Sequence, residues 1–133
     1  KHFESSGGLK GKRIGVWGLA FKPKTDDMRE APAIPIINGL IARGAKVQVF
    51  DPEAMRTARG IFGTKVHYAT SAYDALTGAD ALAIVTEWNE FREPDLDRMK
   101  SLMKAPVIFD GRNLYEPGQM TASGFLYKSI GRA

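Results

Sequence analysis

RIGVW (13–17) and the polar stretch GLAFKPKTDDMRE (18–30) directly after it contain the pattern that decides the fold. The first is a short, nearly continuous apolar run, which predicts a strand covered on both faces. Such a strand normally turns at once into a helix, yet here about a dozen mostly polar residues come first. Because binding residues concentrate on loops held by a rigid scaffold, 18–30 is the first candidate for a site.

Apolar segments and helical patterns alternate along the rest of the chain. Helices are expected after Pro32 with closure at Gly44, from Glu53 to about Arg59, in a short segment capped by Ser71 and closed by Gly78, and after a loop within 87–103. Further strands are expected at 46–50, 66–69, 81–86, 106–110 and 124–130. This alternation predicts a Rossmann-like α/β fold, a three-layer α/β/α sandwich with a mainly parallel sheet.

Length and composition limit the class of protein. A chain of 133 residues suits one domain, here 12–133, preceded by a polar linker remnant at 1–11. There is no cysteine, no apolar run long enough for a bilayer and no signal-peptide pattern, so cytoplasmic residence is the simplest expectation. The net charge of +4 suits an anionic ligand, but no basic block is interleaved with aromatics. We therefore expect neither nucleic acid nor a membrane as partner.

The familiar nucleotide motifs are missing. Gly15 and Gly18 do not form the G-x-G-x-x-G dinucleotide fingerprint, and there is no Walker loop. Lys22, Lys24 and Arg29 could instead form a phosphate clamp.

Two further residue sets have simpler explanations than a metal site. Asp26 and Asp27 could hold Mg²⁺, although a role in shaping the loop is the simpler interpretation. His2 and His67 are isolated from other ligand candidates, so we expect no metal.

Trp17 is expected in the core.

Three polar segments follow predicted strands: 18–30, 86–93 and 110–115. In open α/β sheets, ligands bind beyond the carboxyl ends of the strands. Because parallel strands end at the same edge, these segments are expected to meet on one rim.

Four motifs carry a family resemblance: G-L-A-F-K-P-x-T-D-D-x-R-E at 18–30, FDP at 50–52, TEW at 86–88 and DGRN at 110–113. In this order and across about 9–130, the sequence resembles the C-terminal, UDP-binding domain of the UDP-glucose/GDP-mannose dehydrogenase family. It is most similar to the family's bacterial UDP-glucose 6-dehydrogenases.

The resemblance implies a parent enzyme that oxidises UDP-glucose to UDP-glucuronate with two NAD⁺. It also implies an N-terminal domain that binds NAD and supplies the nucleophilic cysteine, and a long central helix that builds a homodimer. This chain has no cysteine. Because the chemistry needs a thiolate nucleophile, the isolated domain is expected to be inactive and to hold no catalytic residue.

By the same resemblance, Phe21, Lys22 and Arg112 contact the substrate. Arg29 reaches the NAD that is bound by the other domain. The remaining matched positions are expected to hold the shape of the loop: Thr25, Asp26 and Asp27.

Three alternatives stay open. The first is another nucleotide-sugar dehydrogenase, acting on UDP-N-acetylmannosamine or GDP-mannose. The second is a noncatalytic interdomain module that uses an exposed rim with Trp88, Phe91 and Tyr115. The third, a phosphatase or receiver-like domain using Asp51 or Asp110, is disfavoured because no acidic partner set accompanies them.

Overall fold

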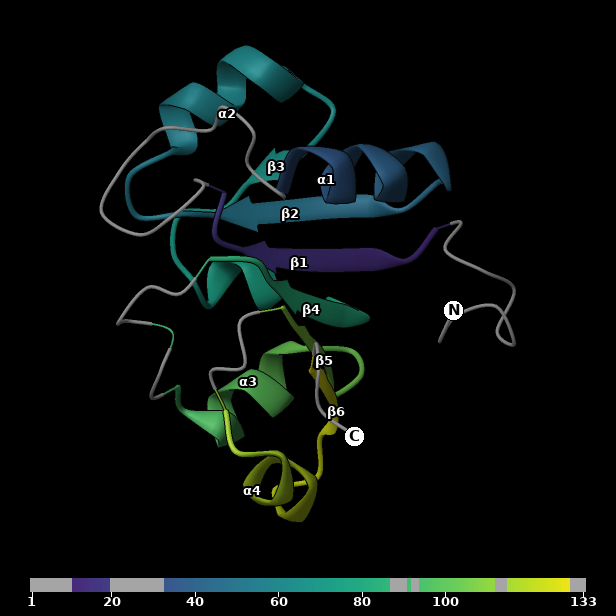
Figure 1. Cartoon of the computed structure of the whole chain (residues 1–133), viewed down its shortest axis with the longest axis vertical. Helices are drawn as coiled ribbons and strands as arrows, with labels where there is room; N and C mark the ends of the chain where they lie inside the picture. Colours follow the sequence, from purple (N-terminus) through teal and green to yellow (C-terminus); the bar gives the residue numbers. More distant parts are fainter. Residues whose placement is uncertain (1–10, 20–32, 87–90, 92–93, 112–114, 130–133) are drawn as a thin grey trace.

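The computed structural model describes residues 11–19, 33–86, 91, 94–111 and 115–129. Its six strands form one sheet in the order β3-β2-β1-β4-β5-β6, and each neighbouring pair is parallel (Figure 1). The strands are β1 (Arg13–Trp17), β2 (Lys46–Phe50), β3 (His67–Tyr68), β4 (Ala81–Ile84), β5 (Val107–Asp110) and β6 (Leu126–Ser129). The Rossmann-like α/β fold with a parallel sheet is thus confirmed.

Helices cover both faces of this sheet. On one face, buried side chains of α1 (Ala33–Ala42) and α2 (Met55–Phe62) pack with alternate residues of the strands, such as Val16. On the other face, the 3₁₀ segment η2 (Asp74–Leu76), α3 (Leu96–Leu102) and α4 (Pro117–Ala122) pack around Trp17. Successive strand residues point to opposite faces, which is why Val16 and Trp17 belong to different core clusters.

Strand order changes direction between β1 and β4. From β1 the chain moves outward through β2 to β3, then returns to β4 beside β1 and moves outward through β5 to β6. In open α/β sheets this switch point opens a crevice at the carboxyl ends of the strands. The polar segment after β1 and the one after β4 both start there.

Helix α2 begins later than expected. The sequence indicated a helix from Glu53 to about Arg59, whereas the helix runs from Met55 to Phe62. The Asp51 carboxylate accepts hydrogen bonds from the backbone N–H of Glu53 at 2.8 Å and of Ala54 at 2.9 Å. These two residues therefore form a turn that precedes the helix.

Two further differences concern short helices. The helix expected after Ser71 shrinks to η2, whose N-cap is Tyr73, although the Ser71 Oγ does accept from the Asp74 N–H at 3.0 Å. No helix was expected where α4 lies, although its signals are present. Glu116 accepts from the Gly118 N–H at 2.7 Å, and Pro117 occupies the first helical position.

Candidate functional site

Hydrogen bonds join the carboxyl ends of four neighbouring strands. The Gly18 N–H donates to the Phe50 carbonyl at 2.9 Å, which ties the end of β1 to β2. The Val85 N–H donates to the Trp17 carbonyl at 2.9 Å, which ties β4 to β1. The Gly111 N–H donates to the Ile84 carbonyl at 2.9 Å, which ties β5 to β4. The three polar segments of the sequence therefore start on one rim, as predicted.

Gly18 lies where the first two segments touch. Its φ of +96° belongs to the region that favours glycine. A Cβ built there would lie 2.5 Å from both the backbone N and the Cβ of Thr86. Only glycine fits this contact, so the start of 18–30 is held directly against the end of β4.

Asp51 fixes the same segment from the other side. Its side chain is 1 % exposed, and Oδ2 accepts from the Leu19 N–H at 2.7 Å. The other oxygen accepts the two N–H groups before α2 described above. The carboxylate of the FDP motif thus holds the start of 18–30 next to the start of α2, which is a structural role rather than that of a phosphatase nucleophile.

Two tyrosines fix the third segment. The Tyr127 hydroxyl, from β6, donates to Oδ2 of the buried Asp110 at 2.6 Å and accepts from the Tyr115 N–H at 3.3 Å. The Tyr115 hydroxyl donates to the carbonyl of Phe91, which lies in the polar segment after β4. Burial raises the pKa of Tyr115 well above its ordinary value, and the Asp110 carboxylate adds to this increase. Tyr115 therefore stays a neutral donor that links two rim segments.

Aromatic packing in the core also holds the segment after β4 in place. Phe91 stacks on Trp17 with ring centroids 4.8 Å apart and an interplanar angle of 19°. The indole N–H of Trp17 donates to the Ala72 carbonyl at 2.8 Å. Trp17 is in the core, as expected.

The predicted exposed aromatic rim is wrong for two of its three members. Phe91 is 0 % exposed and Tyr115 is 6 % exposed, because both rings pack into the core cluster around Trp17. The third member, Trp88, lies outside the described residues. The interdomain-module alternative loses its main support.

The residues assigned by resemblance lie outside the described residues, so their roles stay predictions. What the structure describes is the chain on either side of them. Leu19 and Ala33, the nearest described residues before and after those assigned in the first segment, are both fully buried. Gly111 and Tyr115 are the nearest described residues on either side of Arg112. The residues concerned are Phe21, Lys22, Thr25, Asp26, Asp27, Arg29 and Arg112.

The described residues offer no phosphate loop to a dinucleotide. Gly15 serves packing instead, since a Cβ there would lie 2.6 Å from the Ala75 carbonyl oxygen. Nor do His, Cys, Asp and Glu side chains within these described ranges form a group of three able to hold a metal ion. No helix in this part of the chain has the length and apolar character needed to cross a membrane.

The anchors themselves were missed from the sequence. Asp51 is expected only as part of the FDP motif and as a disfavoured nucleophile, and no role is expected for Tyr127. The signal for Asp51 was its place between a strand and a helix, where aspartate often accepts backbone hydrogen bonds. Nothing in the sequence indicated that Tyr127 would meet Asp110, because their contact depends on the register of β6 against β5, in which Asp110 pairs with Ser129.

Comparisons with known proteins identify one family for this chain. The family model described as "UDP-glucose/GDP-mannose dehydrogenase family, UDP binding domain" matches residues 15–117. UDP-glucose 6-dehydrogenase of Rhizobium meliloti (strain 1021) is 48% identical over 128 residues, which cover 96% of this chain and 29% of that protein. TuaD, a UDP-glucose 6-dehydrogenase of Bacillus subtilis (strain 168), is 48% identical over 95% of this chain and 27% of its own length.

Solved structures give the same result. UDP-glucose dehydrogenase from Pyrobaculum islandicum is 34% identical with a TM-score of 0.81, covering 98% of this chain and 28% of that one. NDP-N-acetyl-D-galactosaminuronic acid dehydrogenase from Methanosarcina mazei Go1 is 29% identical with a TM-score of 0.83, covering 98% of this chain and 27% of that one. The chain spans less than a third of each of these relatives. It belongs to the UDP-glucose/GDP-mannose dehydrogenase family, in which it corresponds to the UDP-binding domain.

Proposed function

We propose that this chain is the nucleotide-binding domain of an NAD-dependent UDP-glucose 6-dehydrogenase and binds the uridine diphosphate end of UDP-glucose. One observation carries the proposal. The segments that begin at Gly18, Thr86 and Asp110 start side by side at the carboxyl edge of the sheet, where such folds bind ligands. The chain in which they do so is matched by the family's UDP-binding domain.

In this proposal the rim binds the substrate and the buried anchors hold it in shape. The Lys22 ammonium pairs with diphosphate oxygens, Phe21 contacts the same moiety, and Arg112 contacts the substrate near the domain junction. Arg29 extends toward NAD on the neighbouring domain. Asp51 fixes the start of the loop that carries Lys22, so the lysine needs less ordering when the ligand binds.

The oxidation itself needs parts that this chain does not contain. The chain has no cysteine, so the thiolate nucleophile would come from the N-terminal catalytic domain of the same enzyme. NAD⁺ would accept hydride when bound, mainly by that domain. The domain alone is therefore proposed to bind UDP or UDP-glucose without turning it over, inside a cytoplasmic enzyme that forms a homodimer.

Sugar specificity has a close alternative within the family. UDP-N-acetyl-mannosamine and GDP-mannose dehydrogenases share the loop motif. Sequence similarity favours UDP-glucose, since the curated UDP-glucose 6-dehydrogenases reach 48% identity, whereas a UDP-D-ManNAc dehydrogenase from Pyrococcus horikoshii reaches 26%.

Calorimetric titration of the chain at low salt with UDP, UDP-glucose, GDP and NAD⁺ tests the proposal. We expect heat from the two uridine ligands and none from NAD⁺. Equal or tighter binding of GDP would overturn the UDP assignment. If the chain alone gives no heat, the titration is repeated with the separately produced catalytic half added. Absence of UDP binding in that mixture would overturn the proposal as a whole.

Lys22→Ala tests the residue assignment. Loss of a charge-assisted contact should weaken UDP binding by about ten- to a hundredfold. The matched control is Lys128→Ala, an exposed lysine of β6 whose loss should leave the affinity unchanged. Circular dichroism checks that both variants fold. Unchanged affinity in a folded Lys22→Ala variant would contradict the assignment.

A further inference from the structure

A pocket of about 530 Å³ lies at the end of the sheet opposite the rim. Arg13 and Lys46, the first residues of β1 and β2, both line it, together with residues just before and at the start of β3. Because the strands are parallel, their first residues lie at the amino end of the sheet. The pocket is thus separate from the segments that follow the strands.

The pocket exists because the edge strand β3 is short. β3 contains only His67 and Tyr68, which pair with Gln48 and Val49 of β2. The first two residues of β2 therefore extend past the start of β3. Residues 64–66 line the other side of the resulting gap.

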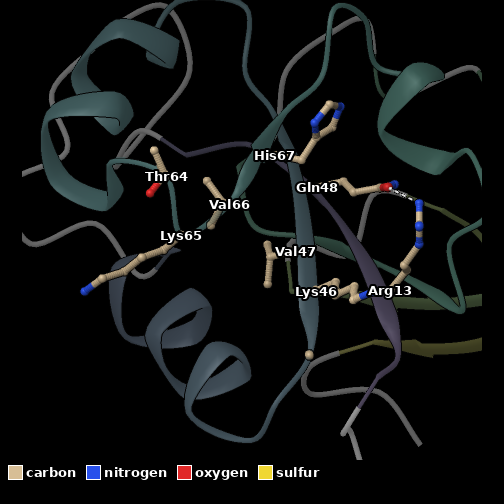
Figure 2. A pocket seen from close by; sticks show the side chains of 9 residues that line it. Arg13, Lys46, Val47, Gln48, Thr64, Lys65, Val66 and His67 are labelled. Carbon is tan, nitrogen blue, oxygen red and sulfur yellow. Dashed lines mark hydrogen bonds between the residues drawn. The ribbon is translucent and has the colours of Figure 1, made fainter.

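Three basic side chains share one face of the sheet at this gap. The register places Arg13 opposite Lys46, and Gln48 opposite His67. Since paired residues share a face and alternate residues along a strand do too, Arg13, Lys46 and His67 lie on the same side around Gln48. All three are exposed, and no acidic residue lines the pocket. Figure 2 shows Lys65 pointing away from this group, so we leave it out.

Gln48 holds the group in place. It is a polar residue in the middle of a strand and is 7 % exposed. Its amide nitrogen donates to the Ala75 carbonyl at 2.9 Å and to the Thr77 carbonyl at 3.2 Å. This fixes the amide so that its oxygen faces Arg13, whose Nη1 donates to it at 3.3 Å (Figure 2). A guanidinium braced by a buried partner loses less conformational freedom on binding.

We propose that Arg13, Lys46 and His67 form a binding site for a phosphate group. Arginine supplies a planar fork of donors, lysine a point charge, and the imidazole a further N–H donor. Arg13 and Lys46 are paired neighbours that can hold one tetrahedral oxyanion, and His67 lies across Gln48 as a donor to the rest of the ligand (Figure 2). The pocket is large enough for a small molecule that carries a phosphate. The ligand class is a small phosphate compound, either free phosphate or a phosphate ester. The site does not depend on the proposed UDP rim.

Amide NMR titration of the ¹⁵N-labelled chain tests this site. Inorganic phosphate, pyrophosphate and glycerol 3-phosphate are added at constant ionic strength, with chloride as the balancing anion. Saturable shifts are expected at residues 46–48 and 65–68, with the rim unaffected. Binding of glycerol 3-phosphate as tight as that of phosphate would identify the phosphate group alone as the ligand, while tighter binding would assign an ester. Either result supports the site.

Substitutions separate a built site from a generally basic surface. The double variant Arg13→Gln/Lys46→Gln removes two exposed cations, so the fold should persist. It should weaken binding by about tenfold or more, as expected for lost charge-assisted contacts. Lys128→Gln removes an exposed lysine on β6, the opposite edge strand, and should bind as the parent does.

Three results would overturn the proposal. The first is the absence of saturable shifts with any of the anions. The second is unchanged binding in a folded double variant. The third is an equal loss in Lys128→Gln, which would mean that net charge alone attracts the anions. A titration with sodium acetate that matches phosphate in site and affinity would overturn the assignment to phosphate.

Discussion

The acidic side chains at one end of the sheet and the basic side chains at the other have different environments. At the carboxyl end, Asp51, Thr86 and Asp110 are each about 1 % exposed. Asp51 accepts a hydrogen bond from the Leu19 N–H just after β1, and Asp110 accepts one from the Tyr127 hydroxyl of β6. At the amino end, Arg13, Lys46 and His67 are exposed around a pocket. The carboxyl end uses buried carboxylates to hold loop geometry, whereas the basic side chains at the amino end stay in solvent.

This difference teaches where substitutions should be costly. A buried carboxylate with several partners cannot be removed without leaving donors unsatisfied. An exposed side chain can change with little effect on the fold. Stability should therefore be more sensitive at the carboxyl end, while the amino end should respond mainly in ligand binding.

Gly18→Ala should have the largest effect. Its Cβ would overlap the Thr86 backbone and side chain, in a backbone conformation with φ of +96°. We expect a loss of about 4 kcal/mol in the free energy of unfolding, from overpacking together with backbone strain. Urea denaturation measures it. Gly39→Ala, in α1 with open space around its Cβ, is the control and should be neutral or stabilising. Equal stability of the two variants would contradict the contact.

Asp51→Asn should come next. Three backbone N–H groups donate hydrogen bonds to the carboxylate. In the variant, the amide NH₂ would replace one carboxylate oxygen, so that two donors would face each other. An unsatisfied buried donor and a lost charge-assisted bond together should cost about 3 kcal/mol. Urea denaturation and UDP titration are both informative, because the variant should also loosen the start of the 18–30 loop. Asp97→Asn, exposed on α3, should change neither quantity.

Tyr115 should make the carboxyl end sensitive to alkali. An unfolded tyrosine releases its proton near pH 10, whereas burial raises the pKa of Tyr115 in the fold. The folded state then binds more protons above pH 10, so the free energy of unfolding should fall there by up to about 1.4 kcal/mol per pH unit. The contribution is fully present below pH 10.

Unfolding curves at pH 9, 10 and 11 measure this decline. Tyr115→Phe should flatten it, although the variant loses the hydrogen bond to Phe91 at every pH. Tyr73→Phe removes only the smallest of the influences that raise the pKa of Tyr115, so it should keep most of the decline. A Tyr115→Phe variant with the parent's slope would contradict the assignment to this hydroxyl.

Gly11→Ala should have the smallest effect and completes the comparison. Gly11 also has a positive φ, of +79°, but nothing lies within 4 Å of its Cβ position. Only the backbone preference is lost, which costs about 1 kcal/mol. Thermal denaturation of both variants gives the loss of stability for each. The difference between Gly18→Ala and Gly11→Ala measures the cost of the steric overlap with Thr86. If Gly11→Ala cost as much as Gly18→Ala, the contrast between the two ends would fail.

The sequence predicted the fold well because the central strands β1, β4 and β5 are short, mostly apolar runs between polar turns. All six strands and the rim they form follow from that pattern together with the rule for parallel sheets. Helix limits were less predictable, because side-chain hydrogen bonds moved them. Asp51 delays α2 until Met55, and η2 ends after a single short turn.

The candidate site could be located from sequence but not built. The sequence motifs indicate which segments contain the candidate site. The hydrogen bonds that hold these segments in place join residues that are far apart in the sequence. Tyr127 and Asp110 meet 17 residues apart through strand register, and Leu19 and Asp51 meet across 32. The burial of Phe91 was not predicted either. Its neighbours in the sequence are charged, which suggests an exposed ring, whereas in the structure the ring stacks on Trp17.

The position of β1 at the centre of the sheet has a consequence for how the chain folds. The strand that comes first in the sequence pairs with β2 and with β4, and its junction with β4 joins Arg13 to Asp80, 67 residues later. Closing so long a loop costs entropy before the pairing compensates for it. Folding should therefore be slow for a domain of this size. We expect β1 to pair with β2 first and with β4 only later.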